Sequence, residues 1–119
     1  FLEKFDMLEN AAQGATFLLN SPYGPDEVWE HLPKEVQEVI LERQLKLWVI
    51  DGKEEARLSA QGVLLGWPGS YGLVCDIGGS SMELADLAEG RVGQRVTSAL
   101  GPLKLREIKG GKKAVKAYV

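Results

Sequence analysis

The sequence has a single cysteine, Cys75, and a single histidine, His31, among its 119 residues. One cysteine excludes an internal disulfide and any multi-cysteine metal or iron–sulfur site built by this chain alone. Cys75 lies in an apolar run, where a free cysteine is usually a small buried side chain. His31 has no second histidine, and only Asp26 and Glu27 as acids at ligand spacing, which predicts a residue on a helix surface.

The sequence also lacks a long apolar run, since none approaches the roughly 20 residues that a membrane-spanning helix needs. Its first ten residues, FLEKFDMLEN, do not have the basic and then apolar order of a secretory signal peptide. The net charge of −3 gives no electrostatic reason to expect nucleic acid or an anionic membrane surface as a partner. We therefore expect a cytoplasmic protein with no nucleic-acid and no membrane partner.

The composition that is present belongs to an ordinary globular protein, with 45% hydrophobic and 26% charged residues. A chain of 119 residues is long enough for one hydrophobic core but not for two. We therefore expect a single α/β domain over residues 1–119.

Hydrophobic periodicity predicts alternating helices and strands. A strand, a helix and a strand within residues 15–51 predict a parallel βαβ unit. A helix over 53–65 and a strand–loop–strand unit follow, and Glu89-Gly90 predicts a hairpin into a strand over 91–98. We expect these strands to form one mixed sheet with helices packed on it, flanked by helices over residues 1–12, 25–32, 33–44, 101–108 and 112–119.

The stretch LVCDIGGSSMEL, residues 73–84, is typical of a strand, a phosphate-sized loop and a second strand. Glycine tolerates positive φ and close approach, so successive amides of such a loop can point at a phosphate. Asp76 at the end of the first strand can hold Mg²⁺ or orient water, and Glu83 can add a second ligand. Read without further context, the same pattern is a plain hairpin. The candidate phosphate-binding residues are Gly78, Gly79, Ser80 and Ser81.

Two families share motifs with the sequence. Residues 1–52, with FLLNSPYGPDEVWEHLPKEVQEVI and KLWVIDG, resemble the γ-type domain of pyruvate:ferredoxin (flavodoxin) oxidoreductase, a Rossmann-like unit. Residues 53–106, with EEARLSAQGVL, DIGGSSMEL and TSALGPLKL, resemble the exopolyphosphatase and guanosine pentaphosphate phosphatase family, which has an actin-like ATPase fold. Residues 107–119 suit the same family but are too generic to count. The chain therefore resembles a mosaic with a seam near Gly52, whether by natural fusion, design or an assembly artefact.

The phosphatase resemblance implies roles for individual residues. It places Asp76, Gly78 and Glu83 around phosphate and metal, and Glu55 as the catalytic general base for the attacking water. Ser80 departs from the family, which usually has a third glycine there, and the loop is strained if that position needs positive φ. The plain alternative for Glu55 is a solvated helix face.

These resemblances imply three functions. The first is a phosphate-, polyphosphate- or nucleotide-binding half-domain with Mg²⁺, which if active would be a phosphoanhydride hydrolase. We expect it to be weak or inactive alone, because the family's site lies between two lobes and nothing in Phe1–Gly52 resembles the other phosphate loop. The second is a structural segment of a 2-oxoacid:ferredoxin oxidoreductase, acting in a larger complex or a homodimer. This chain carries neither a thiamine diphosphate loop nor cluster cysteines. The third is a folded chimera with no selected function.

Overall fold

The computed structural model describes residues 8–119 and divides the chain into two compact units. Unit 1 comprises Phe1–Asp51 and unit 2 comprises Gly52–Val119, so the division falls at the seam expected near Gly52. The helix expected over residues 1–12 lies largely outside the described residues, and residues 8–10 form a turn. The single domain over residues 1–119 stays a prediction.

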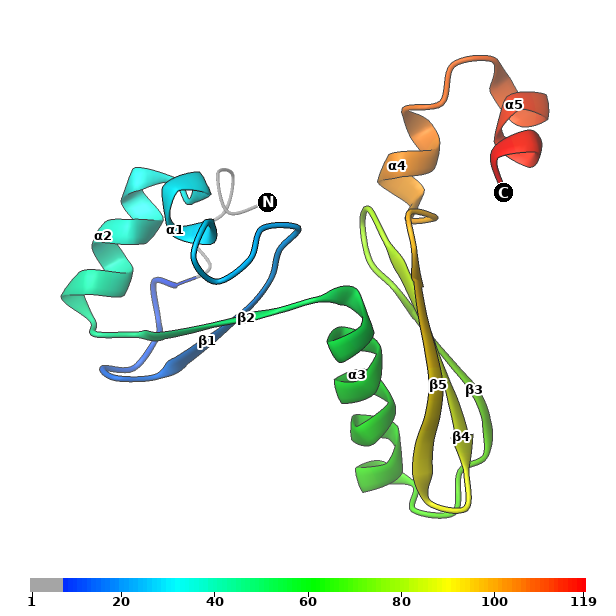
Figure 1. Ribbon diagram of the computed structural model, residues 1–119, viewed down its shortest axis with the longest axis horizontal. Coiled ribbons are helices and arrows are strands. Elements are labelled where there is room, and N and C mark those ends of the chain that lie inside the picture. The colour runs from blue at the N-terminus through cyan, green and yellow to red at the C-terminus, as the bar shows by residue number, and fades with distance from the viewer. Residues whose placement is uncertain (1–7) are drawn as a thin grey trace. The chain divides into compact units, whose positions relative to one another are not determined.

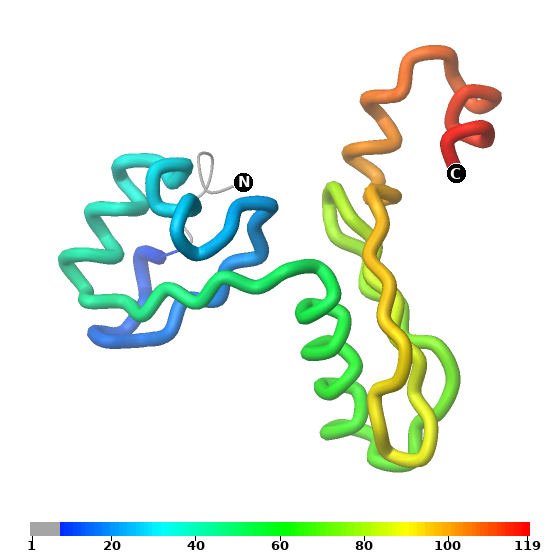
Figure 2. The backbone as a smooth tube through the Cα atoms, in the orientation of Figure 1, coloured from blue at the N-terminus to red at the C-terminus, as the bar shows by residue number. Residues whose placement is uncertain are grey.

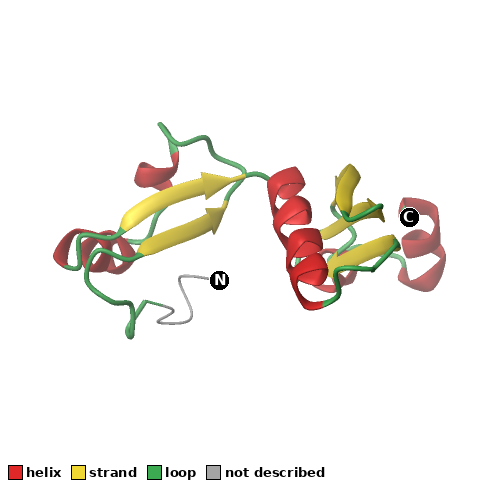
Figure 3. Ribbon diagram, turned by 90° about the horizontal axis from the view of Figure 1, so that it is seen from below, coloured by secondary structure: helices red, strands yellow, loops and turns green. Residues whose placement is uncertain are grey.

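Unit 1 is a parallel βαβ unit, as the sequence predicts. Its two strands pair in parallel from Thr16↔Lys46 to Asn20↔Ile50, and their arrows point the same way in Figure 3. Parallel strands need a crossover connection, which two helices supply here. In chain order the elements are β1 (Thr16–Asn20), α1 (Val28–His31), α2 (Lys34–Glu42) and β2 (Lys46–Ile50).

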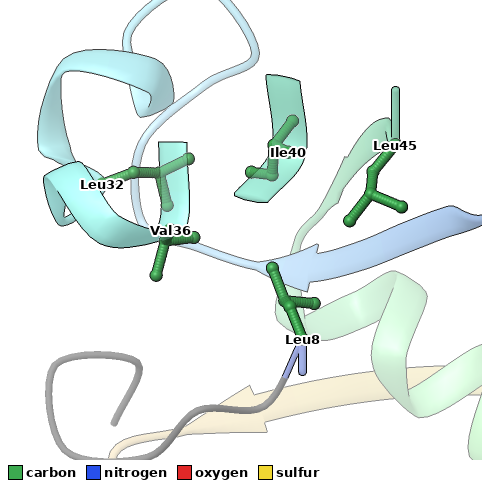
Figure 4. Packing of buried hydrophobic residues seen from close by; sticks show 5 residues of the cluster. All are labelled: Leu8, Leu32, Val36, Ile40 and Leu45. Atoms are coloured by element: carbon green, nitrogen blue, oxygen red, sulfur yellow. The ribbon is translucent and has the colours of Figure 1, made fainter. Parts of the chain in front are cut away.

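The core of unit 1 is aliphatic. Figure 4 shows five of its buried side chains, contributed by the segment before β1, the end of α1, α2 and the turn that follows α2. In that turn Gln44 has a left-handed φ of 53°, and the Leu45 amide donates to the Ile40 carbonyl at 2.9 Å. This is a Schellman-type helix end, which returns Leu45 against α2. The cluster consists of Leu8, Leu32, Val36, Ile40 and Leu45.

Unit 2 is an antiparallel sheet in the order β3-β4-β5 with a helix before it and two after it (Figure 1). The predicted hairpin is confirmed, because Glu89 and Gly90 have φ values of 52° and 71°, as a two-residue type I′ turn requires. The elements are α3 (Gly52–Gly66), β3 (Gly72–Ile77), β4 (Met82–Ala88), β5 (Arg91–Ser98), α4 (Pro102–Arg106) and α5 (Gly111–Tyr118).

Helix α3 covers one face of this sheet with small side chains. Its Ala56 and Ala60 are buried against Ala85 and Leu87 of β4. Successive strand residues point to opposite faces, so every second residue of β3 lies on the face away from α3. Cys75 is one of these residues and is exposed, so the prediction that it is buried in the core is wrong.

The α/β class is confirmed, and both parallel and antiparallel pairing are present. The described strands form two sheets, however, one of two strands and one of three, and not the single mixed sheet that we expected. Figure 2 follows the chain through α4 and back through α5. Gly110 and Gly111, at the start of α5, both have positive φ. Within residues 8–119, no helix has both the length and the apolar character that crossing a membrane requires.

Candidate functional site

Three polar side chains lie in one row across the sheet of unit 2. Asp76 of β3 pairs with Glu83 of β4, and Glu83 pairs with Thr97 of β5. Residues directly opposite one another in antiparallel strands project to the same face, so the three side chains share one side of the sheet. We call Asp76, Glu83 and Thr97 the polar row. It joins the two carboxylates that the sequence analysis singled out on either side of the loop.

Glu83 is the most unusual member of the polar row, because only 1% of it is exposed. Among the described residues it is the one buried residue that is polar or charged. Burying a carboxylate costs free energy unless it accepts hydrogen bonds. The Thr97 hydroxyl supplies one, with its Oγ1 donating to Glu83 Oε1 at 2.8 Å. An acid kept in such a position indicates a role other than stability.

The first two turns of α3 cross the polar row. At one end, a Cβ on Gly52 would lie 2.4 Å from Thr97 Oγ1, so this close approach requires glycine. At the other end, Ser59 Oγ donates to Asp76 Oδ2 at 2.5 Å. Glu55 lies between these contacts along the helix and is half-buried. Residues four apart on a helix have Cβ atoms about 5–6 Å apart, which places the Glu55 Cβ within roughly 10 Å of the Asp76 carboxylate.

The loop between β3 and β4 is a tight hairpin loop whose first amide is already engaged. Gly78 N–H donates to the Ser81 carbonyl at 3.0 Å. Gly78, Gly79 and Ser80 are not among the described residues with positive φ, so the loop does not use the left-handed conformation that glycine tolerates. Ser80 therefore replaces a glycine without the backbone strain that a positive φ would cause. Gly79 packs against Leu103, because a Cβ there would approach Leu103 Cδ1 to 3.0 Å and the leucine side chain would have to shift slightly.

The start of α4 braces this loop from one side. The Gly101 amide donates to the Ser80 carbonyl at 3.2 Å, and the Leu103 amide donates to the Gly79 carbonyl at 2.8 Å. A Cβ on Gly101 would lie 2.3 Å from the carbonyl carbon of Ser80. The contact is between two backbones, so neither side can yield by a side-chain rotation. The loop and the beginning of α4 thus form one closely packed element.

An ion pair on α3 lies beside the candidate general base. Arg57 donates to both carboxylate oxygens of Glu54, from Nε at 2.9 Å and from Nη2 at 2.5 Å. This hydrogen bonding, with the charges of Arg57 and Arg95, holds the pKa of Glu54 below its usual 4.5 although partial burial opposes the shift. The same bond raises the pKa of Arg57. Arg57 therefore pairs with Glu54 on this helix.

The donor set of the polar row suits magnesium better than zinc. Residues 8–119 contain no group of three or more histidine, cysteine, aspartate or glutamate side chains that could hold a metal ion. Mg²⁺ is usually bound through one or two carboxylates, with waters and substrate phosphate completing its shell. Asp76 and Glu83 supply two carboxylates from paired positions, so these residues fit Mg²⁺.

Three residues of this region were missed by reasoning from the sequence. Ser59 and Thr97 hydrogen-bond the two acids, and Gly101 packs on the loop. Ser59 carried a usable signal, because it follows Glu55 by four residues and so lies on the same helix face. Thr97 and Gly101 carried none, because their contacts depend on strand register and on the course of the chain after β5.

The chain is similar to one protein family and to several solved structures of that family. The model of the Ppx/GppA phosphatase family matches residues 26–108, beginning well before the expected residue 53 and so including α1, α2 and β2. An exopolyphosphatase from Cytophaga hutchinsonii is 28% identical with a TM-score of 0.52, over 62% of this chain and 25% of that one. The Aquifex aeolicus PPX-GPPA enzyme is 26% identical with a TM-score of 0.54, over 71% of this chain and 32% of that one.

The curated relatives belong to the other resemblance. Pyruvate-flavodoxin oxidoreductase from Rhodospirillum rubrum is 53% identical over 62 residues, which is 52% of this chain and 5% of that protein. The enzyme of the same name from Trichormus variabilis is 56% identical over 57 residues, 48% of this chain and 5% of that protein. The chain thus spans about 5% of the length of these relatives. Both resemblances are confirmed, as a mosaic requires.

Proposed function

The chain belongs to the Ppx/GppA phosphatase family, and on that premise we propose that unit 2 binds a phosphate-containing small molecule together with Mg²⁺. The observation that carries the proposal is the polar row beneath α3, with a buried Glu83 directly opposite Asp76. The solved relatives include an exopolyphosphatase, which favours a polyphosphate or another phosphoanhydride as the ligand class.

The residues take distinct parts in this proposal. Asp76 and Glu83 hold Mg²⁺, which when bound neutralises charge on the phosphate oxygens. The phosphate lies against the hairpin loop of Gly78, Gly79, Ser80 and Ser81. Gly78 gives its amide to Ser81, so the remaining three amides are the donors we assign to the phosphate.

Hydrolysis of a phosphoanhydride needs a base for the attacking water, and we assign this part to Glu55. Its carboxylate takes a proton from the water as the oxygen attacks the terminal phosphorus, and the bond to the bridging oxygen breaks. Glu54 is held by Arg57 and is not assigned this part. Because one phosphate loop alone leaves the reacting phosphate partly in water, we expect binding to be easier to detect than turnover.

Binding is tested by thermal unfolding with MgCl₂ and tripolyphosphate. Ligand at ten times its Kd stabilises the folded state by about 1.4 kcal/mol, so the Tm of the wild type should rise. Asp76→Ala should remove the rise. Asp86→Ala is the matched control, because Asp86 lies on β4 but pairs with Leu73 and so belongs to the other face. No rise in the wild type, or an equal rise in Asp76→Ala, contradicts the proposal.

Turnover is tested by phosphate release from tripolyphosphate. Glu55→Gln should lower the rate by about 10²–10⁴-fold if Glu55 is the general base. Glu54→Gln is the control, since it makes the same change one residue away. Equal loss in both variants would show a general effect of charge on α3 and remove Glu55 from the mechanism.

A second candidate function rests on the identity to pyruvate-flavodoxin oxidoreductases, which exceeds half of the aligned residues. In this case unit 1 is a structural segment that assembles with larger oxidoreductase chains. Co-elution of the chain with such a complex on size-exclusion chromatography supports it, and a clean monomer in the presence of the complex contradicts it. Failure of this assay and of phosphate binding together would leave a folded chimera.

A further inference from the structure

A serine in the middle of α3 makes a hydrogen bond that its position in a helix does not require. Serine within a helix commonly donates back to a carbonyl of its own preceding turn. Ser59 instead donates across to the sheet, from Oγ to Asp76 Oδ2 at 2.5 Å, and joins residues 17 apart in the sequence. The side chain is half-buried and the bond is partly shielded from water.

The bond links the two elements that carry the proposed acids. Glu55 precedes Ser59 by one turn on the same face of α3, and Asp76 is the member of the polar row on β3. The other end of the same helix segment is fixed where Gly52 packs against Thr97. Ser59 therefore links the helix turn that follows Glu55 directly to the Asp76 carboxylate.

We propose that Ser59 is a positioning residue for the phosphate and Mg²⁺ site, an inference that rests on the proposed function. Its hydroxyl has one proton, which occupies Oδ2 of Asp76 and leaves Oδ1 as the oxygen for Mg²⁺ or its bound water. The carboxylate is thereby held in one orientation before the ligand arrives, which avoids the loss of side-chain freedom on binding. Groups that orient a metal ligand in this way typically change metal affinity 10–100-fold when they are removed.

The plain alternative is that the bond only helps α3 to pack on the sheet. Both roles would lower the stability of a Ser59→Ala variant, so stability does not separate them. Metal affinity and the state of the Asp76 carboxylate do separate them, because packing elsewhere along α3 reaches neither. Ser59→Thr keeps the hydroxyl, whereas Ser59→Ala removes only the oxygen.

The experiment measures the Kd of MgCl₂ in saturating inorganic phosphate by isothermal titration calorimetry. Wild type, Ser59→Ala, Ser59→Thr and Asp76→Ala are compared, with Gln61→Ala as the control for an exposed change on α3. We expect a Kd 10–100-fold higher in Ser59→Ala, recovery towards wild type in Ser59→Thr, and no change in Gln61→Ala. The side-chain carboxyl ¹³C resonance of Asp76, recorded without ligand, should move in Ser59→Ala and return in Ser59→Thr.

The possible results separate the positioning role of Ser59 from the proposed binding of phosphate and Mg²⁺. If Ser59→Ala binds Mg²⁺ as wild type does while Asp76→Ala does not, the positioning role is overturned and the proposed function stands. If the Asp76 resonance is unchanged in Ser59→Ala, the hydrogen bond does not orient the carboxylate and the inference also fails. If wild type binds neither Mg²⁺ nor phosphate, both are overturned.

Discussion

The interiors of the two units differ in kind. The buried residues described in unit 1 are all hydrophobic, and five of them form one aliphatic cluster against α1 and α2. Unit 2 buries three alanines and one leucine in its cluster, and beside them a carboxylate. Large aliphatic side chains supply most of the free energy of folding, whereas a buried acid costs some of it. Unit 2 therefore buries a charged group where unit 1 buries only hydrophobic ones, and departures of this kind from a hydrophobic core are most often found at functional sites.

The largest expected effect tests the aliphatic side of the comparison. Ile40→Ala removes a side chain that is 5% exposed from the centre of the unit 1 cluster, and it should lower the free energy of unfolding by about 2–5 kcal/mol. Hydrogen exchange of the β1 and β2 amides measures the loss. Leu41→Ala on the same helix, where Leu41 is 67% exposed, should change exchange little. Equal effects of the two variants would mean that the cluster does not carry the stability of unit 1.

A smaller effect tests the close packing of unit 2. Gly101→Ala drives a Cβ into the backbone of Ser80, and overpacking of this kind typically lowers stability by about 1–3 kcal/mol. Gly62→Ala on α3 is the matched control, because a Cβ there meets nothing within 4 Å. It should raise stability by about 0.5–1 kcal/mol. Urea unfolding measures the change in the free energy of unfolding for each variant. No change in Gly101→Ala would show that the loop shifts to accommodate the added Cβ.

The smallest effect concerns charge on the surface of unit 2. Arg57 holds the pKa of Glu54 below 4.5, so the folded state binds this proton more weakly than the unfolded chain does. The pair therefore stabilises the fold above about pH 4.5, and this contribution is lost as the pH falls through the lower pKa of the folded state. Wild type should be slightly more stable than Glu54→Gln at pH 7, and the difference should shrink as the pH falls below 4.5. Thermal unfolding across that range measures it, and a constant difference at every pH would contradict it.

Much of the fold could be predicted from the sequence because local signals and tertiary packing agree. Glu89-Gly90 gave the hairpin, and strand, helix and strand within residues 15–51 gave the parallel pair. The prediction for Cys75 failed because an apolar run does not indicate how many faces of a strand are covered, and α3 packs on the face of β3 opposite to Cys75. The expectation of one mixed sheet failed for a related reason, since the choice of neighbouring strands depends on long-range pairing and not on local sequence pattern.

The two acids of the candidate site could be predicted from the sequence, but the residues that hydrogen-bond them could not. The spacing of Asp76 and Glu83 around a four-residue loop places them opposite each other once the hairpin forms. The loop adopts no positive φ at Gly78, Gly79 or Ser80, so the conditional expectation of strain at Ser80 does not apply. The bond from Ser59 needed the position of α3 over the sheet, which periodicity alone does not give.

Cys75 and Asp76 are neighbours in sequence but project from opposite faces of β3, and the thiol is exposed. A maleimide fluorophore attached to this one cysteine would therefore stand behind the polar row without blocking it. Because no other thiol is present, labelling would be uniform without any engineered substitution. The chain thus carries a natural attachment point for an optical probe within one residue of the Asp76 carboxylate.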